Sequence, residues 1–216
     1  MEIILLMFTL GYLCQVAGSV LLIRKIRRKK NTEGLSFDTQ ICYLIGSIAR
    51  IVWVNKTRLS KHYLVWLELL ISIGIAAYTV YLFIKYKDRE AVPVNNPFKL
   101  PYLLIATVVL SYFFHPGKRD AYMQMLVSFT IFLEAMGMVP QIYTMRKLKT
   151  VEVTIGHYVF SLALSRVFRL IFWIISYVDG VAFGYLIIAD LVHTVFLADF
   201  VYFYLRTKPG TPILLQ

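Results

Sequence analysis

The sequence predicts an all-α membrane protein in which seven transmembrane helices form a single domain over residues 1–216. Hydrophobic residues make up 59% of the chain and charged residues 16%, whereas soluble domains carry about 25% charged residues. Seven apolar stretches follow one another, most of them near the roughly 20 residues that cross a bilayer. The basic residues, which give a net charge of +11, lie in the short connectors. This placement is typical of membrane topology and argues against nucleic-acid binding.

The first apolar stretch is expected to be a retained helix. It begins with Glu2, where a signal peptide would carry basic residues, and a dense basic block follows it. The fourth stretch is the shortest and begins at Lys99-Leu100-Pro101. The predicted spans are 3–23, 37–54, 63–84, 100–114, 121–143, 155–178 and 181–205.

The distribution of basic residues tests this count. With seven spans and the N-terminus in the lumen, the cytosolic side holds fifteen basic residues and the luminal side five, as the positive-inside rule requires. Removing the fourth span would place the block Arg146–Lys149 on the wrong side of the membrane. We therefore expect a luminal N-terminus and a cytosolic C-terminus.

A coarse internal repeat is also present. An apolar stretch, a basic block and a stretch with an internal arginine occur in this order in residues 1–85 and again in 121–205. Pro140-Gln141 is predicted to end the fifth span. The pattern favours a 3+1+3 arrangement of parallel repeats, similar to PQ-loop and SWEET proteins, with residues 100–114 as the linker helix and a site between the halves.

Three arginines, Arg50, Arg166 and Arg169, lie deep inside predicted spans. An ionisable side chain at that depth costs roughly 2.5–3.5 kcal/mol, so it faces a partner or a wet cavity. Glu134 is expected near the level of Arg166, which predicts a Glu134–Arg166 ion pair. Arg50 and Arg169 are expected nearer the lumen, without an acid of similar depth on their own helices. We predict that these two, with Arg166 beside them, form a site for an external carboxylate, such as a peptide C-terminus rich in Asp and Glu.

Other polar residues in the spans suggest further roles. Asp190 and His193 lie three residues apart, so they share one face of the seventh helix. Glu68 and Asp199 are the remaining intramembrane acids. Residues 1–216 contain no nucleophile–base spacing, glycine-rich phosphate loop or metal-ligand cluster, so we expect neither an enzyme nor a cofactor.

Several short motifs, in this order and spacing, resemble the KDEL receptors, the ER lumen protein-retaining receptors. The resemblance covers most of the chain and is strongest over residues 129–205. The motifs are Ala49-Arg50, Phe132-Leu133-Glu134-Ala135, Val139-Pro140-Gln141, Gly156-His157-Tyr158-Val159-Phe160 and Ala198-Asp199-Phe200.

The resemblance implies a multi-pass receptor of the ER and Golgi membranes. It would bind the C-terminal tetrapeptide of escaped ER residents in the acidic Golgi and return them in COPI-coated vesicles. In that scheme Arg50 holds the peptide carboxylate, Glu134 and Arg166 form a bridge that rearranges on protonation, and Asp199 acts in return transport.

This chain departs from the family pattern at positions that bear on specificity and pH sensing. Trp53 and Gln124 replace acids, Ser165 replaces a tyrosine, Ser176 replaces an arginine, and a first-helix histidine is missing near residues 12–15. His193 with Asp190 is then the intramembrane candidate for a pH sensor. The sequence leaves two other functions open, a small-solute transporter of the PQ-loop or SWEET type and a ligand-free scaffold whose arginines are internally paired.

Overall fold

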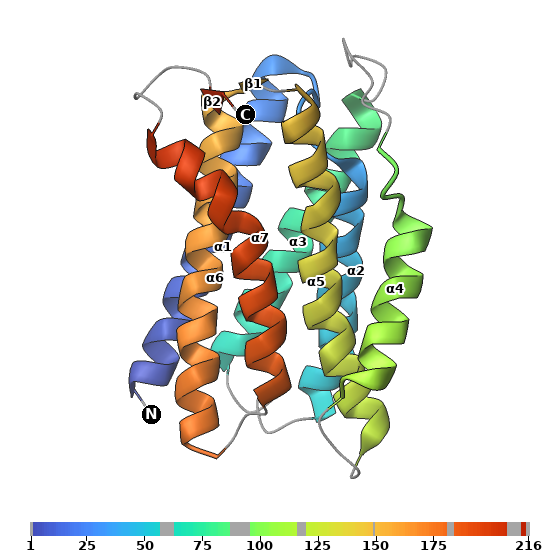
Figure 1. The fold of residues 1–216 in the computed structure, drawn as a ribbon, viewed down its shortest axis with the longest axis vertical. Helices are drawn as coiled ribbons and strands as arrows, with labels where there is room; N and C mark the ends of the chain where they lie inside the picture. Colours follow the sequence, from blue (N-terminus) through green and yellow to red (C-terminus); the bar gives the residue numbers. More distant parts are fainter. Residues whose placement is uncertain are drawn as a thin grey trace.

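In the part of the chain that the computed structural model describes, seven helices form an upright bundle with a short β-sheet at one end (Figure 1). The described residues are 2–56, 63–86, 96–115, 120–148, 150–180, 184–206 and 213–214. The helices are α1 (Glu2–Lys29), α2 (Phe37–Lys56), α3 (Tyr63–Tyr86), α4 (Leu100–Phe113), α5 (Ala121–Leu148), α6 (Val153–Val178) and α7 (Gly184–Arg206). Strands β1 (Thr150–Val151) and β2 (Ile213–Leu214) pair antiparallel, with Thr150 opposite Leu214. Each predicted span therefore contains a helix.

Among the described residues, five helices are long and apolar enough to cross a bilayer, namely α1, α2, α3, α5 and α6. Helix α4 is apolar but has only 14 residues, which corresponds to about 21 Å. Its start is favoured by a proline in the first turn, where no intrahelical N–H bond is lost. Large apolar side chains are exposed on the outside of the bundle, including Leu70, Ile105 and Val195, as a lipid-facing surface requires.

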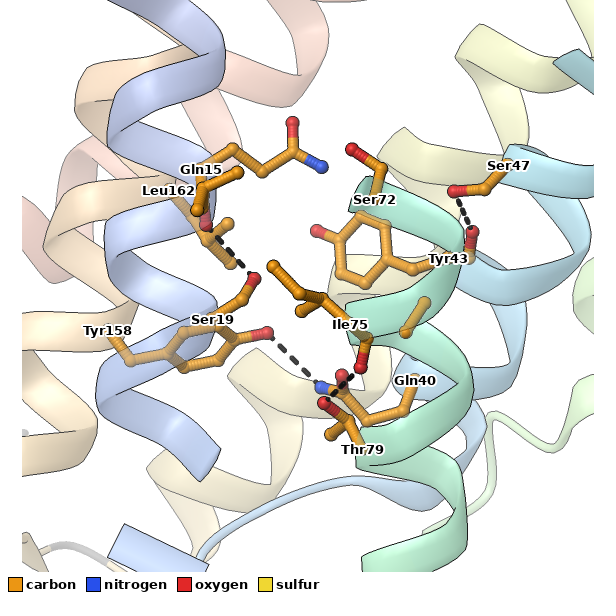
Figure 2. A pocket seen from close by; sticks show the side chains of 12 residues that line it. Gln15, Ser19, Gln40, Tyr43, Ser47, Ser72, Ile75, Thr79, Tyr158 and Leu162 are labelled. Carbon is orange, nitrogen blue, oxygen red and sulfur yellow. Dashed lines mark hydrogen bonds between the residues drawn. The ribbon is translucent and has the colours of Figure 1, made fainter. Parts of the chain in front are cut away.

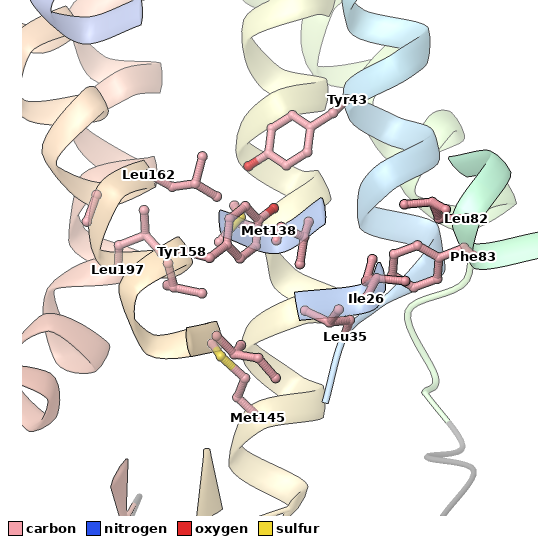
Figure 3. Packing of buried hydrophobic residues seen from close by; sticks show 14 residues of the cluster. Ile26, Leu35, Tyr43, Leu82, Phe83, Met138, Met145, Tyr158, Leu162 and Leu197 are labelled. Atoms are coloured by element: carbon pink, nitrogen blue, oxygen red, sulfur yellow. The ribbon is translucent and has the colours of Figure 1, made fainter. Parts of the chain in front are cut away.

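The two halves of the sequence pack against each other, because α1 lies along α6 and α2 lies along α5. Small residues allow the close approach. A side chain on Gly137 of α5 would come within 2.8 Å of the Cβ of Cys42 on α2. The largest apolar cluster joins six of the helices near the β-sheet end, and Figure 3 shows it around Ile26, Tyr158 and Leu197.

Helix α5 does not end at Pro140-Gln141, so that prediction is wrong. The helix continues to Leu148 with Pro140 inside it. Proline removes only one main-chain hydrogen bond of the helix. The carbonyl of Pro140 accepts bonds from Asn96 Nδ2 at 2.9 Å and Thr144 Oγ1 at 2.8 Å. These contacts also tie the segment before α4 to the side of α5.

Gln141 fixes the connector between α1 and α2 instead. Its Oε1 accepts the backbone N–H of Ser36 at 2.9 Å, and its Nε2 donates to the carbonyl of Gly34 at 2.9 Å. Gly34 has φ +78°, a conformation that favours glycine. The connector is thereby held against α5, which fixes where α2 begins and the height at which Arg50 enters the bundle.

Candidate functional site

A single carboxylate, that of Glu134 on α5, organises the centre of the bundle. Its Oε2 accepts hydrogen bonds from Arg166 Nη1 at 2.9 Å and Arg169 Nη1 at 2.7 Å. Its Oε1 accepts a bond from Arg50 Nη2. The contact between Glu134 and Arg166 is the one that the sequence predicts. Glu134 is 2% exposed and Arg166 is 1% exposed, so these charges interact without screening by solvent.

Arg50 has further partners on two other helices. Its Nη1 donates to the Tyr12 hydroxyl of α1 at 2.6 Å and to Glu68 Oε1 of α3 at 3.2 Å. The guanidinium also lies 5.6 Å from the centre of the Tyr12 ring. Glu68 in turn accepts the hydroxyl of Ser72 at 2.8 Å. Arg50 therefore connects α1, α2, α3 and α5.

A third acid, Asp190 of α7, closes the cluster on the side of α6. Its carboxylate oxygens lie 3.6 Å from Arg166 Nη1 and 4.0 Å from Arg169 Nε. Asp190 is fully buried. Within the described residues, neither of its oxygens has a hydrogen-bond partner. The Asp190 carboxylate therefore compensates the positive charge of Arg166 and Arg169 without a hydrogen bond to either, and its oxygens can still accept a hydrogen bond.

Among the described residues, the cluster contains three guanidinium groups and three carboxylates, so its formal charges balance. Arg50 and Arg169 have no acid of similar depth on their own helices, as the sequence indicates, but they are not uncompensated, since both bind Glu134 of α5. The acids that pair with these arginines lie on neighbouring helices. Helices that pack side by side bring Glu134, Glu68 and Asp190 to the arginines from α5, α3 and α7.

A cavity of about 220 Å³ separates this cluster from the end of the bundle where α1 begins. Arg50 and Arg169 line it, but Arg166 does not. The other walls are almost entirely apolar and aromatic, and the rings of Phe8 and Phe172 lie 5.7 Å apart. The remaining lining residues are Ile4, Leu5, Tyr12, Trp53, Val65, Thr130, Ile131 and Trp173. Arg50 and Arg169 thus present cationic groups at the base of an apolar cavity.

A second, polar pocket lies on the other side of the cluster, between α1, α2, α3 and α6 (Figure 2). Its volume of about 30 Å³ has room for roughly two water molecules. Gln40 Nε2 donates to the Tyr158 hydroxyl there at 3.1 Å. Ser72 lines this pocket and also bonds Glu68, so it joins the pocket to the charged cluster. From Val65 in the cavity to Thr79 in the pocket, the site extends about 21 Å along α3.

Some predicted site residues are not tested by this geometry. His193 and Asp199 lie on α7, but their side chains lie outside the described part of the structure. Sequence reasoning also missed contributors, above all Tyr12, Phe8 and Trp173. The spacing of Phe8 and Tyr12, four residues apart on one helix face, is the available signal, but aromatic pairs of this kind are common in apolar helices.

Comparison with known proteins identifies the family. A model of the ER lumen protein retaining receptor family matches residues 31–176. The chain is 29% identical over 207 residues to the ER lumen protein-retaining receptor of Saccharomyces cerevisiae, covering 90% of this chain and 91% of that protein. It is 28% identical over 197 residues to ER lumen protein-retaining receptor 3 of Mus musculus, covering 90% of each.

A relative from Caenorhabditis briggsae, also an ER lumen protein-retaining receptor, is 27% identical over 198 residues and aligned over 89% of both chains. These matches cover α2 to α6 and therefore include Arg50, Glu134, Arg166 and Arg169. The chain belongs to the ER lumen protein-retaining receptor family.

Proposed function

We propose that this protein is a retention receptor that binds the C-terminal tetrapeptide of ER luminal proteins and returns them from the Golgi to the ER. All seven helices span the membrane in this proposal, with the beginning of α1 in the lumen and the end of α7 in the cytosol. Helices α1–α3 and α5–α7 are the two repeats of one domain, with α4 as the linker. The packing of α1 on α6 and of α2 on α5 supports this arrangement.

The observation that carries the proposal is the position of Arg50 and Arg169 at the base of the apolar cavity near the beginning of α1, the end that faces the lumen in this proposal. A peptide that enters this cavity reaches these two guanidinium groups at its base, whereas Arg166 does not line the cavity. Each can offer two parallel N–H donors to a carboxylate. The terminal carboxylate of the ligand would then share or replace the contacts that Glu134 makes with the two arginines, while Arg166 keeps its bond to Glu134.

Charge balance couples this binding to protons. The described part of the cluster has three positive and three negative groups, so an incoming carboxylate adds one uncompensated negative charge in a buried site. Uptake of one proton restores the balance, and Glu134 or Asp190, the latter with His193, is the proposed acceptor. Ligand and proton then each strengthen the binding of the other, by thermodynamic linkage. Capture in an acidic compartment and release at neutral pH follow from this coupling.

Return to the ER requires recognition on the cytosolic side. We propose that the loaded receptor enters COPI-coated vesicles and that Asp199, near the cytosolic end of α7, acts in this step. The ER and Golgi membranes are then its two locations. When the ligand replaces Glu134 as a partner of Arg50, the contact between α2 and α5 changes. Ligand binding on the luminal side is thereby transmitted along α5 to the cytosolic end of the bundle.

A binding assay with the purified full chain tests the proposal. Peptides that end in acidic tetrapeptides are titrated at about pH 5.5 and about pH 7.4, on either side of the range in which imidazole titrates. The control peptide has the same sequence with an amidated C-terminus. Loss of a hydrogen bond to a charged group costs about 1.5–3 kcal/mol, so Arg50→Ala and amidation should each weaken binding about 10- to 150-fold.

The variants separate the roles of individual residues. Arg169→Ala should weaken binding as Arg50→Ala does, and His193→Ala should remove the difference between the two pH values if His193 with Asp190 senses protons. Equal binding of the free and amidated peptides would overturn the proposed carboxylate site. A ligand-free scaffold would bind neither peptide. The internal pairing of the arginines is compatible with both a scaffold and a receptor, so the binding assay distinguishes them. Family membership gives no support to the solute-transporter alternative.

A further inference from the structure

A second hollow, with a volume of about 580 Å³, lies at the opposite end of the bundle, between the end of α1 and the beginning of α6. This is the end that carries β1 and β2 in Figure 1. Its volume falls in the range of about 300–1,000 Å³ that is typical of small-ligand sites. The residues that line it are Leu21, Arg24, Lys25, Arg27, Arg28, Lys29, Glu152 and Thr154.

Two of the five basic residues that line the hollow, Lys25 and Lys29, already have partners within the protein. Lys25 is buried and donates to Asn31 Oδ1 at 3.1 Å and to the carbonyl of Glu33 at 2.8 Å. Lys29 forms an ion pair with Glu152 at 2.9 Å, which neutralises the acid among the described residues that line the hollow. The charge that remains for a ligand therefore comes from the arginines.

Arg24, Arg27 and Arg28 are exposed, and no hydrogen bond or ion pair of theirs occurs among the described residues. They occupy positions i, i+3 and i+4, so they project from one face of α1. Leu21 lies one turn before Arg24 on the same face. The hollow thus has an apolar side chain, that of Leu21, next to three guanidinium groups that are unpaired in the described structure.

The depth of these arginines identifies the kind of ligand. The apolar stretch of α1 ends at Ile23, so Arg24 to Arg28 lie about 1.5–7.5 Å beyond the hydrocarbon boundary. The headgroup layer of one leaflet is about 5–8 Å thick. The arginines are therefore level with lipid phosphates, and Leu21 is level with the first acyl carbons.

We propose that this hollow binds the headgroup of a polyphosphorylated lipid, such as a phosphoinositide, in the membrane leaflet. Phosphomonoester groups carry more than one negative charge and accept paired N–H bonds from arginine. Three arginines on one face match several phosphate groups better than the single charge of an ordinary anionic lipid. The proposal does not depend on peptide binding at the luminal cavity.

The test uses the full chain reconstituted in lipid nanodiscs, with native mass spectrometry to count bound lipids. Phosphatidylinositol bisphosphate is compared with phosphatidylserine at equal surface charge, and soluble inositol phosphate and inorganic phosphate are added as competitors. The variant is Arg24→Gln/Arg28→Gln. The matched control, Lys85→Gln/Lys99→Gln, removes the same charge from exposed positions at the same end of the bundle.

Each basic residue near an anionic lipid contributes about a fivefold gain in binding. The arginine variant should therefore bind the bisphosphate lipid about 25-fold more weakly, while the lysine control changes less than threefold. Since both arginines are exposed and unpaired, the thermal stability of the variant should match the wild type, and each single substitution should show its own fivefold loss. Equal binding of the two lipids, or equal losses in the variant and the control, would refute the site. If soluble inositol phosphate binds the hollow as tightly as the lipid does, the ligand is a free phosphate compound and the proposed lipid is refuted.

Discussion

Replacing Glu134 by glutamine tests whether one carboxylate holds the centre of the bundle together. The substitution keeps the size of the side chain but removes the negative charge shared by Arg50, Arg166 and Arg169. Three buried guanidinium groups would then face two carboxylates. The new amide group would also point N–H donors toward a site that contains donors already.

The expected cost follows from the burial of the pair. Removing one partner of a buried ion pair costs about 3–5 kcal/mol, and Glu134 is 2% exposed. For a chain of this size, 1 kcal/mol corresponds to about 2–4 °C in the melting temperature. Glu134→Gln should therefore lower the apparent melting temperature in detergent by about 6–20 °C.

Two further variants make the result specific. Glu152→Gln removes a half-exposed ion pair with Lys29 and should cost less than about 1 kcal/mol. The double variant Glu134→Gln/Arg166→Met restores equal numbers of positive and negative groups. It should recover at least about 1 kcal/mol relative to the sum of the single effects. The reasoning fails if Glu134→Gln melts within 2 °C of the wild type, or if the double variant shows only additive losses.

Two further predictions concern packing, each measured as the apparent melting temperature. Gln141→Leu should lower stability by about 2–4 kcal/mol, because the connector between α1 and α2 loses both bonds to α5 and leaves the buried N–H of Ser36 and the partly buried carbonyl of Gly34 unpaired. Gly137→Ala should cost about 1–3 kcal/mol, because the added methyl group lies 2.8 Å from Cys42 Cβ. Gly74→Ala is its control, since nothing lies within 4 Å of the added group, and it should stabilise α3 by up to about 1 kcal/mol. A loss in both glycine variants would show that the close α2–α5 contact is not the cause.

Sequence reasoning located the elements well because the signal for each is local. Apolar length and basic connectors placed a helix within every predicted span. The one local rule that failed was the stop signal at Pro140. Proline removes only the N–H that would bond the carbonyl one turn earlier, and the helix continues to Leu148. Proline is also more frequent in membrane-spanning helices than in the helices of soluble proteins.

The partners of the charged residues could be predicted only in part. The contact of Glu134 with Arg166 followed from depth, since two residues at the same level in packed helices can meet. The bonds of Arg50 to Tyr12 and Glu68 depend on which faces of α1, α2 and α3 turn inward. That rotation is set by the packing of all helices together, and strongly apolar helices give little sequence signal for it.

If a ligand carboxylate binds as proposed, the shared carboxylate of Glu134 would make the site respond as a unit. Glu134 uses one oxygen for Arg50 and the other for Arg166 and Arg169. A ligand carboxylate at Arg50 and Arg169 competes with Glu134 for one bond at Oε1 and one bond at Oε2. The bond between Glu134 and Arg166 is not affected, because Arg166 does not line the cavity. Helix α5 would then keep its tie to α6 through Arg166 while its tie to α2 weakens. Because Arg50 is also bonded to α1 and α3, the predicted motion separates α5 from a group of three helices rather than from α2 alone.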